Sequence, residues 1–99
     1  MFEKSVSKYS KKLGINIPEI NIKSQKARWG SVTKSGKINL NQKLIRAPQK
    51  IIDYVAAHEI CHIKIPNHSP AYWELLESIT SDYRERKEWL RINKSILLE

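Results

Sequence analysis

The stretch between Pro48 and Pro66 constrains the fold of this chain more than any other part. Its first half is apolar around most of the circumference of a helix, through Ile51, Ile52, Tyr54, Val55 and Ala56. Pro48 suits the first turn of a helix, and Pro66 disfavours helical backbone at Ile65, so the helix is expected to end near Lys64. A helix of this kind is expected to be central and buried.

The N-terminal half combines one helix with strands. Apolar residues at three- and four-residue steps predict a first helix from Phe2 to Leu13. Alternation of apolar and polar residues over 20–22 predicts a strand. The segments 27–32 and 37–41 flank a turn that contains Gly36, which is typical of a β-hairpin. We expect an α+β protein with a small antiparallel sheet of about three strands.

Two more helices are expected after Pro66. Ser69–Pro70 combines an N-cap residue with a first-turn proline and predicts a helix over Ala71–Ile79. The capping-box pattern Asp82–Glu85 predicts a last helix over Tyr83–Asn93. Neither repeats nor linkers interrupt the chain, so residues 1–99 are expected to form a single domain.

The composition indicates in which cellular compartment the protein is expected. A single cysteine excludes an internal disulfide and suits a reducing compartment. The N-terminus is too charged for a signal peptide, and no apolar run is long enough to span a bilayer. We therefore expect a cytoplasmic protein without a membrane partner.

The net charge of +8 is unevenly distributed. Residues 1–50 hold twelve Lys or Arg and two acidic residues, whereas residues 51–99 hold six and eight. The simpler interpretation of the basic half is a solvated lysine-rich face. The alternative is a nucleic-acid surface, although no nucleic-acid-binding motif accompanies the charge.

His58, Glu59 and His62 form an H-E-x-x-H motif inside the expected central helix. Residues four apart share one helix face, so both imidazoles can reach one Zn²⁺ at about 2.0–2.1 Å. Glu59 lies beside the metal without having to bind it, and can accept a proton from an attacking water. The alternative, a metal-free histidine pair on a helix surface, is disfavoured by the buried helix and its early end.

A catalytic zinc usually has three protein ligands. His68 follows His62 by six residues and lies past the helix break, where the chain must turn and can return to the metal. Glu74 and Glu77, on the next helix, are the rival third ligands. We favour His68 over these glutamates and over a role for His68 as a loop residue that caps the next helix.

The other conspicuous residues near the motif have structural interpretations. Cys61 projects away from His58 on the helix, so a buried core thiol is favoured over a soft metal ligand. Trp73 and Trp89 are expected to pack the late helices against the central one. Tyr72 is interpreted as core, with an oxyanion contact as the alternative. Arg28–Ser31 is either a strand edge that can pair with an extended peptide or a strand ending in a glycine bulge.

Five segments, taken in order, resemble the YgjP-like metallopeptidase domain, a zincin family related to the SprT-like and WLM peptidases. They read ARWGS, GKINLN, IIDYVAAHEICHI, NHSPAYW and DYRERKEWLR, and they cover nearly the whole chain. The resemblance implies a minimal zincin fold, with the sheet packed on the H-E-x-x-H helix and helices at both ends. It also implies one Zn²⁺ per chain on His58, His62 and His68, with Glu59 as the general base.

The chain departs from the family pattern in two respects. Val32 stands where the family usually has a cysteine, so no metal or redox role is expected at that position. Family members are also usually longer, with a β-rich N-terminal region. The chain therefore resembles the peptidase domain alone, and the resemblance predicts its chemistry but not its substrate.

Together these features predict a zinc-dependent metallopeptidase that acts on a peptide or protein. The alternative is a nucleic-acid-associated protein with a mainly structural zinc, or a peptidase recruited to nucleic-acid-bound substrates through residues 1–50. A structural zinc normally has four protein ligands. Cys61 is the candidate for the fourth, and it is a weak one. Duplex binding that weakens steeply with salt would support a nucleic-acid role, and no binding at low salt would remove it.

Overall fold

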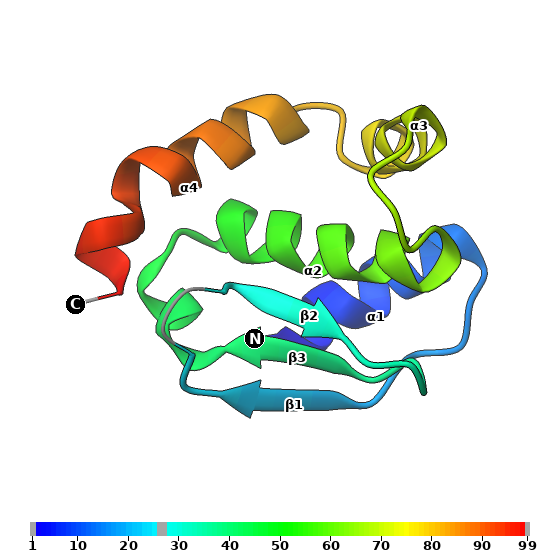
Figure 1. The fold of residues 1–99 in the computed structure, drawn as a ribbon, viewed down its shortest axis with the longest axis horizontal. Coiled ribbons are helices and arrows are strands. Elements are labelled where there is room, and N and C mark those ends of the chain that lie inside the picture. The colour runs from blue at the N-terminus through cyan, green and yellow to red at the C-terminus, as the bar shows by residue number, and fades with distance from the viewer. Residues whose placement is uncertain (1, 26–27, 99) are drawn as a thin grey trace.

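The computed structural model describes residues 2–25 and 28–98. Within them the chain forms four α-helices, a three-stranded sheet and a short 3₁₀ helix (Figure 1). In chain order these are α1 (Phe2–Leu13), β1 (Ile20–Lys23), β2 (Gly30–Val32), β3 (Ile38–Asn41), η1 (Gln42–Arg46), α2 (Gln49–Lys64), α3 (Pro70–Ile79) and α4 (Tyr83–Leu97). None of the described helices combines the length and the apolar character needed to cross a bilayer.

The helix α2 is the centre of the molecule, as its apolar sequence predicts. Nine of its sixteen residues are buried, and it contacts α1, α3, α4, β2 and β3. In Figure 1 the sheet lies on one side of α2, and α3 and α4 lie on the other. The expected ends are also confirmed, because α2 starts directly after Pro48 and stops at Lys64, where Ile65 is extended (φ −132°).

The sheet has the strand order β1-β3-β2 and is mixed. The predicted hairpin is confirmed: β2 and β3 pair antiparallel, and Gly36 has φ +86° in the turn. Of the segment 27–32 predicted for its first strand, Gly30–Val32 form β2, and residue 27 lies outside the described residues. The prediction that the whole sheet is antiparallel is wrong, because β1 pairs with β3 in parallel. The reason is that β3 returns between β1 and β2, so β2 and its turn serve as the crossover that a parallel pair requires.

The helix α4 starts at Tyr83, as predicted, but its N-terminal capping and its C-terminal end differ from the sequence prediction. The capping box is wrong, because Asp82 makes no side-chain cap hydrogen bond and its carboxylate pairs with Arg86 Nε at 2.9 Å. The helix continues to Leu97, beyond the predicted end, and its last carbonyls accept from η1. Lys43 Nζ lies 2.7 Å from the Leu98 carbonyl, and Arg46 Nη1 lies 3.1 Å from that of Leu97. Two cations therefore cap the negative end of the helix and fix its position over α2.

A buried asparagine holds the segment that leads into β2. Asn41 has no exposed surface; its Nδ2 donates to the carbonyls of Gln25 and Arg28, both at 2.9 Å, and its Oδ1 accepts from Lys43 N at 3.0 Å. Because Asn41→Ala leaves these buried groups without partners, we expect it to lower the free energy of unfolding by about 2–4 kcal/mol in urea denaturation.

The exposed Asn16 provides the matched control for this measurement. Asn16→Ala should change the free energy of unfolding by about 0.5 kcal/mol or less. Equal losses for the two variants would show that the Asn41 hydrogen bonds contribute little to stability.

Candidate active site

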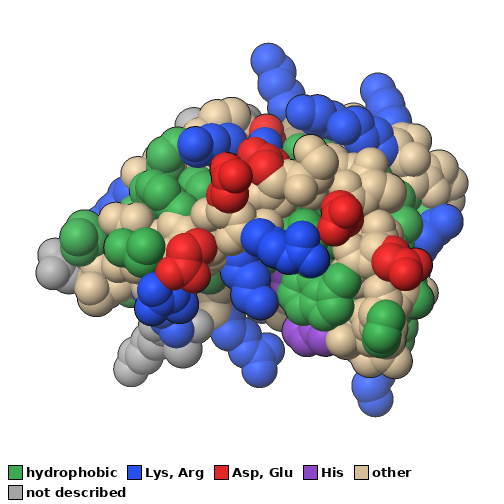
Figure 2. Space-filling view, turned by 90° about the horizontal axis from the view of Figure 1, so that it is seen from above, with side chains coloured by type: hydrophobic (Ala, Val, Ile, Leu, Met, Phe, Trp, Pro, Cys, Tyr) green, Lys and Arg blue, Asp and Glu red, His purple; other side chains and the backbone are tan. Residues whose placement is uncertain are grey.

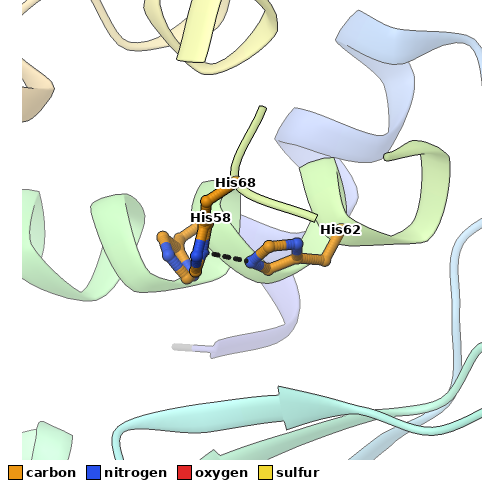
Figure 3. Close-up of side chains that lie close together, drawn as sticks. All are labelled: His58, His62 and His68. Atoms are coloured by element: carbon orange, nitrogen blue, oxygen red, sulfur yellow. Dashed lines mark hydrogen bonds between the residues drawn. The ribbon is translucent and has the colours of Figure 1, made fainter. Parts of the chain in front are cut away.

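His58 and His62 lie one turn apart on α2 and face the same side (Figure 3). Both are half-buried, and their ring centroids are 4.8 Å apart. His62 Nδ1 lies 3.1 Å from the Ile65 carbonyl, at the point where α2 ends. When Nδ1–H donates to that carbonyl, the lone pair of His62 Nε2 is available to a metal.

His68 joins this pair from the loop that follows Pro66. Its Nε2 lies 2.9 Å from His62 Nε2, and Figure 3 shows the loop returning over α2 to bring it there. One ligand nitrogen from each of His58, His62 and His68 lies within 4.8 Å of the others. The structure therefore brings together the three histidines that the sequence predicts as ligands.

Tyr72 on α3 contacts the histidines through its hydroxyl and its ring. Its side chain has no exposed surface, its hydroxyl donates to the His58 carbonyl at 2.8 Å, and its ring stacks on His62 at a centroid distance of 4.3 Å. The hydroxyl is thus committed to α2 and does not face the solvent. The interpretation of Tyr72 as a core residue is confirmed.

Trp73 is the neighbour of His68 on the other side. The two rings stack at 5.3 Å, and Trp73 also stacks on Tyr83 at 5.5 Å, while Lys87 Nζ lies 4.8 Å from the Trp73 ring. Trp73 and Trp89 both pack against the core, as predicted. The loop histidine is therefore held by aromatic contacts with α3, which in turn contact α4.

Glu59 is buried (6% exposed), and its Oε2 lies 3.2 Å from His58 Nδ1. Gly30 on β2 faces it directly: a Cβ at Gly30 would lie 3.0 Å from Glu59 Cγ, 3.2 Å from its Oε2 and 2.9 Å from the Asn39 carbonyl oxygen. Only glycine allows β2 to approach the carboxylate this closely. Sequence reasoning treated Gly30 as a bulge or strand edge, and the residues around it gave no signal of this contact.

The rival ligands lie elsewhere. Cys61 is fully buried in the core, and burial raises the pKa of its thiol to about 12, so the thiolate that a metal needs is disfavoured. Glu74 and Glu77 border a separate hollow on α3 with Arg84. Among the described residues, neither these glutamates nor Cys61 joins the histidine group.

The histidine group has the chemistry of a metal site. Burial, followed by the nearby His62 and His58, lowers the pKa of His68 below its usual value, which keeps its imidazole neutral at pH 7. A metal requires deprotonated imidazole nitrogens, and three of them suit an ion that keeps one coordination position open. The donors present therefore fit a catalytic metal ion.

Two clefts meet at this group. The first, of about 520 Å³, lies between α2, α4 and the start of β2, and is lined by Arg28, Trp29, Gly30, Tyr54, Val55, His58, Glu59, His62, Lys87, Leu90, Arg91 and Lys94. The second, of about 610 Å³, lies along the β2–β3 turn, and is lined by Ser31, Val32, Thr33, Lys34, Ser35, Gly36, Glu59, His62, Ile63, Pro66 and His68. Glu59 and His62 border both clefts, so a ligand lying across them passes the carboxylate.

Comparison with known families agrees with this site. Residues 1–93 match the model of the YgjP-like metallopeptidase domain. The chain belongs to this family. The resemblance seen in its sequence is thereby confirmed, and with it the class of the protein as a metallopeptidase. A search among curated proteins finds no significant match to this YgjP-like chain.

Solved structures share the fold of the YgjP-like chain. The metallopeptidase zymogen abylysin of Pyrococcus abyssi superposes with a TM-score of 0.82 at 24% identity, over 96% of this chain and 94% of that one. The zymogen jannalysin of Methanocaldococcus jannaschii gives a TM-score of 0.77 at 24% identity, over 97% of both chains. The predicted α+β fold is confirmed, apart from the direction of β1.

The close approach of Gly30 to Glu59 can be tested by adding one methyl group. Because the added Cβ meets a backbone oxygen as well as Glu59, Gly30→Ala should lower the free energy of unfolding by about 1–3 kcal/mol. It should also lower peptidase activity by displacing the carboxylate. Urea denaturation and a peptide-cleavage assay measure the two effects.

Gly14→Ala is the control, because Gly14 has φ +67° at the end of α1 and no neighbour within 4 Å of an added Cβ. It should cost about 1 kcal/mol through backbone strain and leave cleavage unchanged. If Gly30→Ala retains full activity, Glu59 does not depend on the glycine.

Proposed function

We propose that this chain is a zinc-dependent peptidase in which His58, His62 and His68 hold one Zn²⁺ and Glu59 is the general base. One observation carries the proposal: the three histidine nitrogens lie within 4.8 Å of one another, with the Glu59 carboxylate beside them where the two clefts meet. A catalytic zinc site requires metal ligands, a base beside them and a cleft through which the substrate can reach both.

Zinc suits these residues better than other common metals. Imidazole is a preferred ligand of Zn²⁺, whereas Mg²⁺ and Ca²⁺ prefer oxygen ligands. Three histidines leave one position of a tetrahedral site open, as catalytic zinc sites do. When bound, zinc polarises the substrate carbonyl and lowers the pKa of water to about 7, which makes hydroxide available at neutral pH.

Glu59 supplies the proton transfers. Its carboxylate is held by contact with Gly30 and by His58 Nδ1, so it stays at the junction of the clefts. There it can accept a proton from the attacking water and pass the proton to the leaving amine. Burial against β2 keeps the carboxylate away from bulk solvent, which limits loss of that proton between the two steps.

The edge of β2 supports a peptide as the substrate. In the described sheet β2 pairs only with β3, so its second edge is available for hydrogen bonds. Gly30 borders one cleft and Ser31 and Val32 border the other. An extended peptide that adds to this edge would place one bond in front of Glu59.

The alternative of a structural zinc has less support, because Cys61 lies outside the histidine group and a closed site needs a fourth ligand. Recruitment to nucleic acid through residues 1–50 stays a prediction. In its favour, Lys4, Lys8 and Lys11 are exposed at four- and three-residue steps on α1 and share one face. A cytoplasmic location also stays a prediction.

Metal content and activity together test the proposal. Elemental analysis of the purified protein should give about one zinc per chain, and His58→Ala and His68→Ala should each lose or weaken it. Glu59→Gln should keep the zinc and lower kcat/KM for a peptide by about 10²-fold or more, because the proton acceptor is removed.

Glu74→Ala and Cys61→Ala are the matched controls, since both residues lie outside the histidine group. Both variants should retain zinc. If His58→Ala loses zinc but His68→Ala keeps it, His68 is not the third ligand. Full activity of zinc-loaded Glu59→Gln would remove the assigned base.

A further inference from the structure

The two clefts that meet at Glu59 differ in charge. Among the described residues, the cleft under α4 is lined by the four cations Arg28, Lys87, Arg91 and Lys94 and by one acidic side chain, Glu59 itself. The cleft along the β2–β3 turn has one cation and three hydroxyl side chains. A substrate that spans both therefore meets a strongly positive field on one side of Glu59 only.

Three of the four cations lie on one face of α4. Lys87, Arg91 and Lys94 follow one another at four- and three-residue steps, and Leu90, between them, is buried. The face is fixed in place because η1 caps the end of α4 and Arg86 Nη1 donates to the Lys50 carbonyl at 3.0 Å. Figure 2, seen from the α4 side, shows Lys and Arg side chains gathered beside a histidine.

Among the described residues, two of the four cations have neither an acidic partner nor an aromatic ring beneath them. Arg91 pairs with Glu88, with Nε at 3.0 Å from Oε1, and Lys87 lies over the Trp73 ring. Within residues 2–25 and 28–98, Arg28 and Lys94 form no ion pair. Both border the cleft, Arg28 from the segment before β2 and Lys94 from α4, and the apolar Trp29 and Leu90 line the same cleft.

We propose that this cationic cleft is a substrate subsite for a carboxylate, bound mainly by Arg28 and Lys94, so that the enzyme prefers peptides with an acidic group on one side of the cleaved bond. The carboxylate can belong to an Asp or Glu side chain or to the C-terminus of the substrate. The proposal rests on the peptidase function proposed above and adds the class of substrate. Trp29 and Leu90 provide apolar surface for the methylene groups of the same residue.

Matched peptides test the subsite. One series has amidated C-termini and carries Glu or Gln at single positions before and after the cleaved bond, and a second has free or amidated C-termini. We expect kcat/KM to be about tenfold higher for the acidic member of a pair, on one side of the bond only, as for one charge-assisted hydrogen bond. The ratio should fall as salt is raised.

Enzyme variants assign the preference to the cleft. In Arg28→Gln/Lys94→Gln the Glu-to-Gln ratio should fall towards one, whereas Lys64→Gln, at the exposed end of α2, should keep the wild-type ratio. A higher kcat/KM with an internal Glu identifies a side-chain carboxylate as the ligand, and a higher kcat/KM with a free C-terminus identifies the terminal carboxylate. Either result supports the subsite. A wild-type ratio near one in both series, or a ratio that the double variant leaves unchanged, overturns it.

Binding separates this inference from the peptidase function. Fluorescently labelled Glu and Gln peptides are titrated against Glu59→Gln by anisotropy, and the Glu peptide should bind about tenfold tighter. Suppose that the zinc-loaded wild type cleaves no peptide, but the Glu peptide still binds more tightly and loses this advantage when Arg28→Gln/Lys94→Gln is added. The peptidase function is then wrong and the carboxylate subsite is supported. If peptides are cleaved without a charge preference, the subsite fails and the function stands.

Discussion

The burial of α2 is the constraint on which the rest of the structure depends. Each buried aliphatic side chain on it, such as Ile51, Ile52 or Ile60, contributes about 1.5–3 kcal/mol when removed from water. Because α1, the sheet, α3 and α4 all contact this helix, its rotation about its own axis is fixed. That rotation sets which way His58 and His62 face, and it turns Glu59 towards β2.

The third histidine needs a different kind of support, because it lies in a loop. Ordering a loop residue costs about 1–2 kcal/mol of backbone entropy, and aromatic contacts offset part of this cost. Trp73 stacks on His68, while Tyr72 stacks on His62 and holds the His58 carbonyl. Two consecutive residues of α3 thus contact all three histidines. The helix break at Pro66 and the start of α3 at Pro70 therefore act together to shape the site.

Sequence reasoning succeeded where local rules decide the outcome. Helix periodicity placed His58 and His62 on one face, Pro66 ended α2, and Gly36 marked the hairpin turn. It failed where distant segments compete. The parallel β1–β3 pairing depends on which strand occupies the middle of the sheet. The Asp82 carboxylate binds Arg86 in place of the backbone it was expected to cap, and the Gly30–Glu59 contact joins residues that no local pattern relates. That residues 1–99 form a single domain, and that the metal is zinc, stay predictions.

The charge of the site shows why composition by segment is a poor guide to a surface. Residues 51–99 carry more acidic than basic side chains, yet they provide three of the four cations above Glu59. The rotation of α4 about its own axis explains the difference. Lys87, Arg91 and Lys94 share the face that lines the cleft, whereas Glu85 and Glu88 are exposed outside it. Within about 8 Å, the screening length at physiological salt, such local charges outweigh the net charge of the chain. The charge around Glu59 therefore depends on how α4 is anchored to η1, and the H-E-x-x-H motif alone does not specify it.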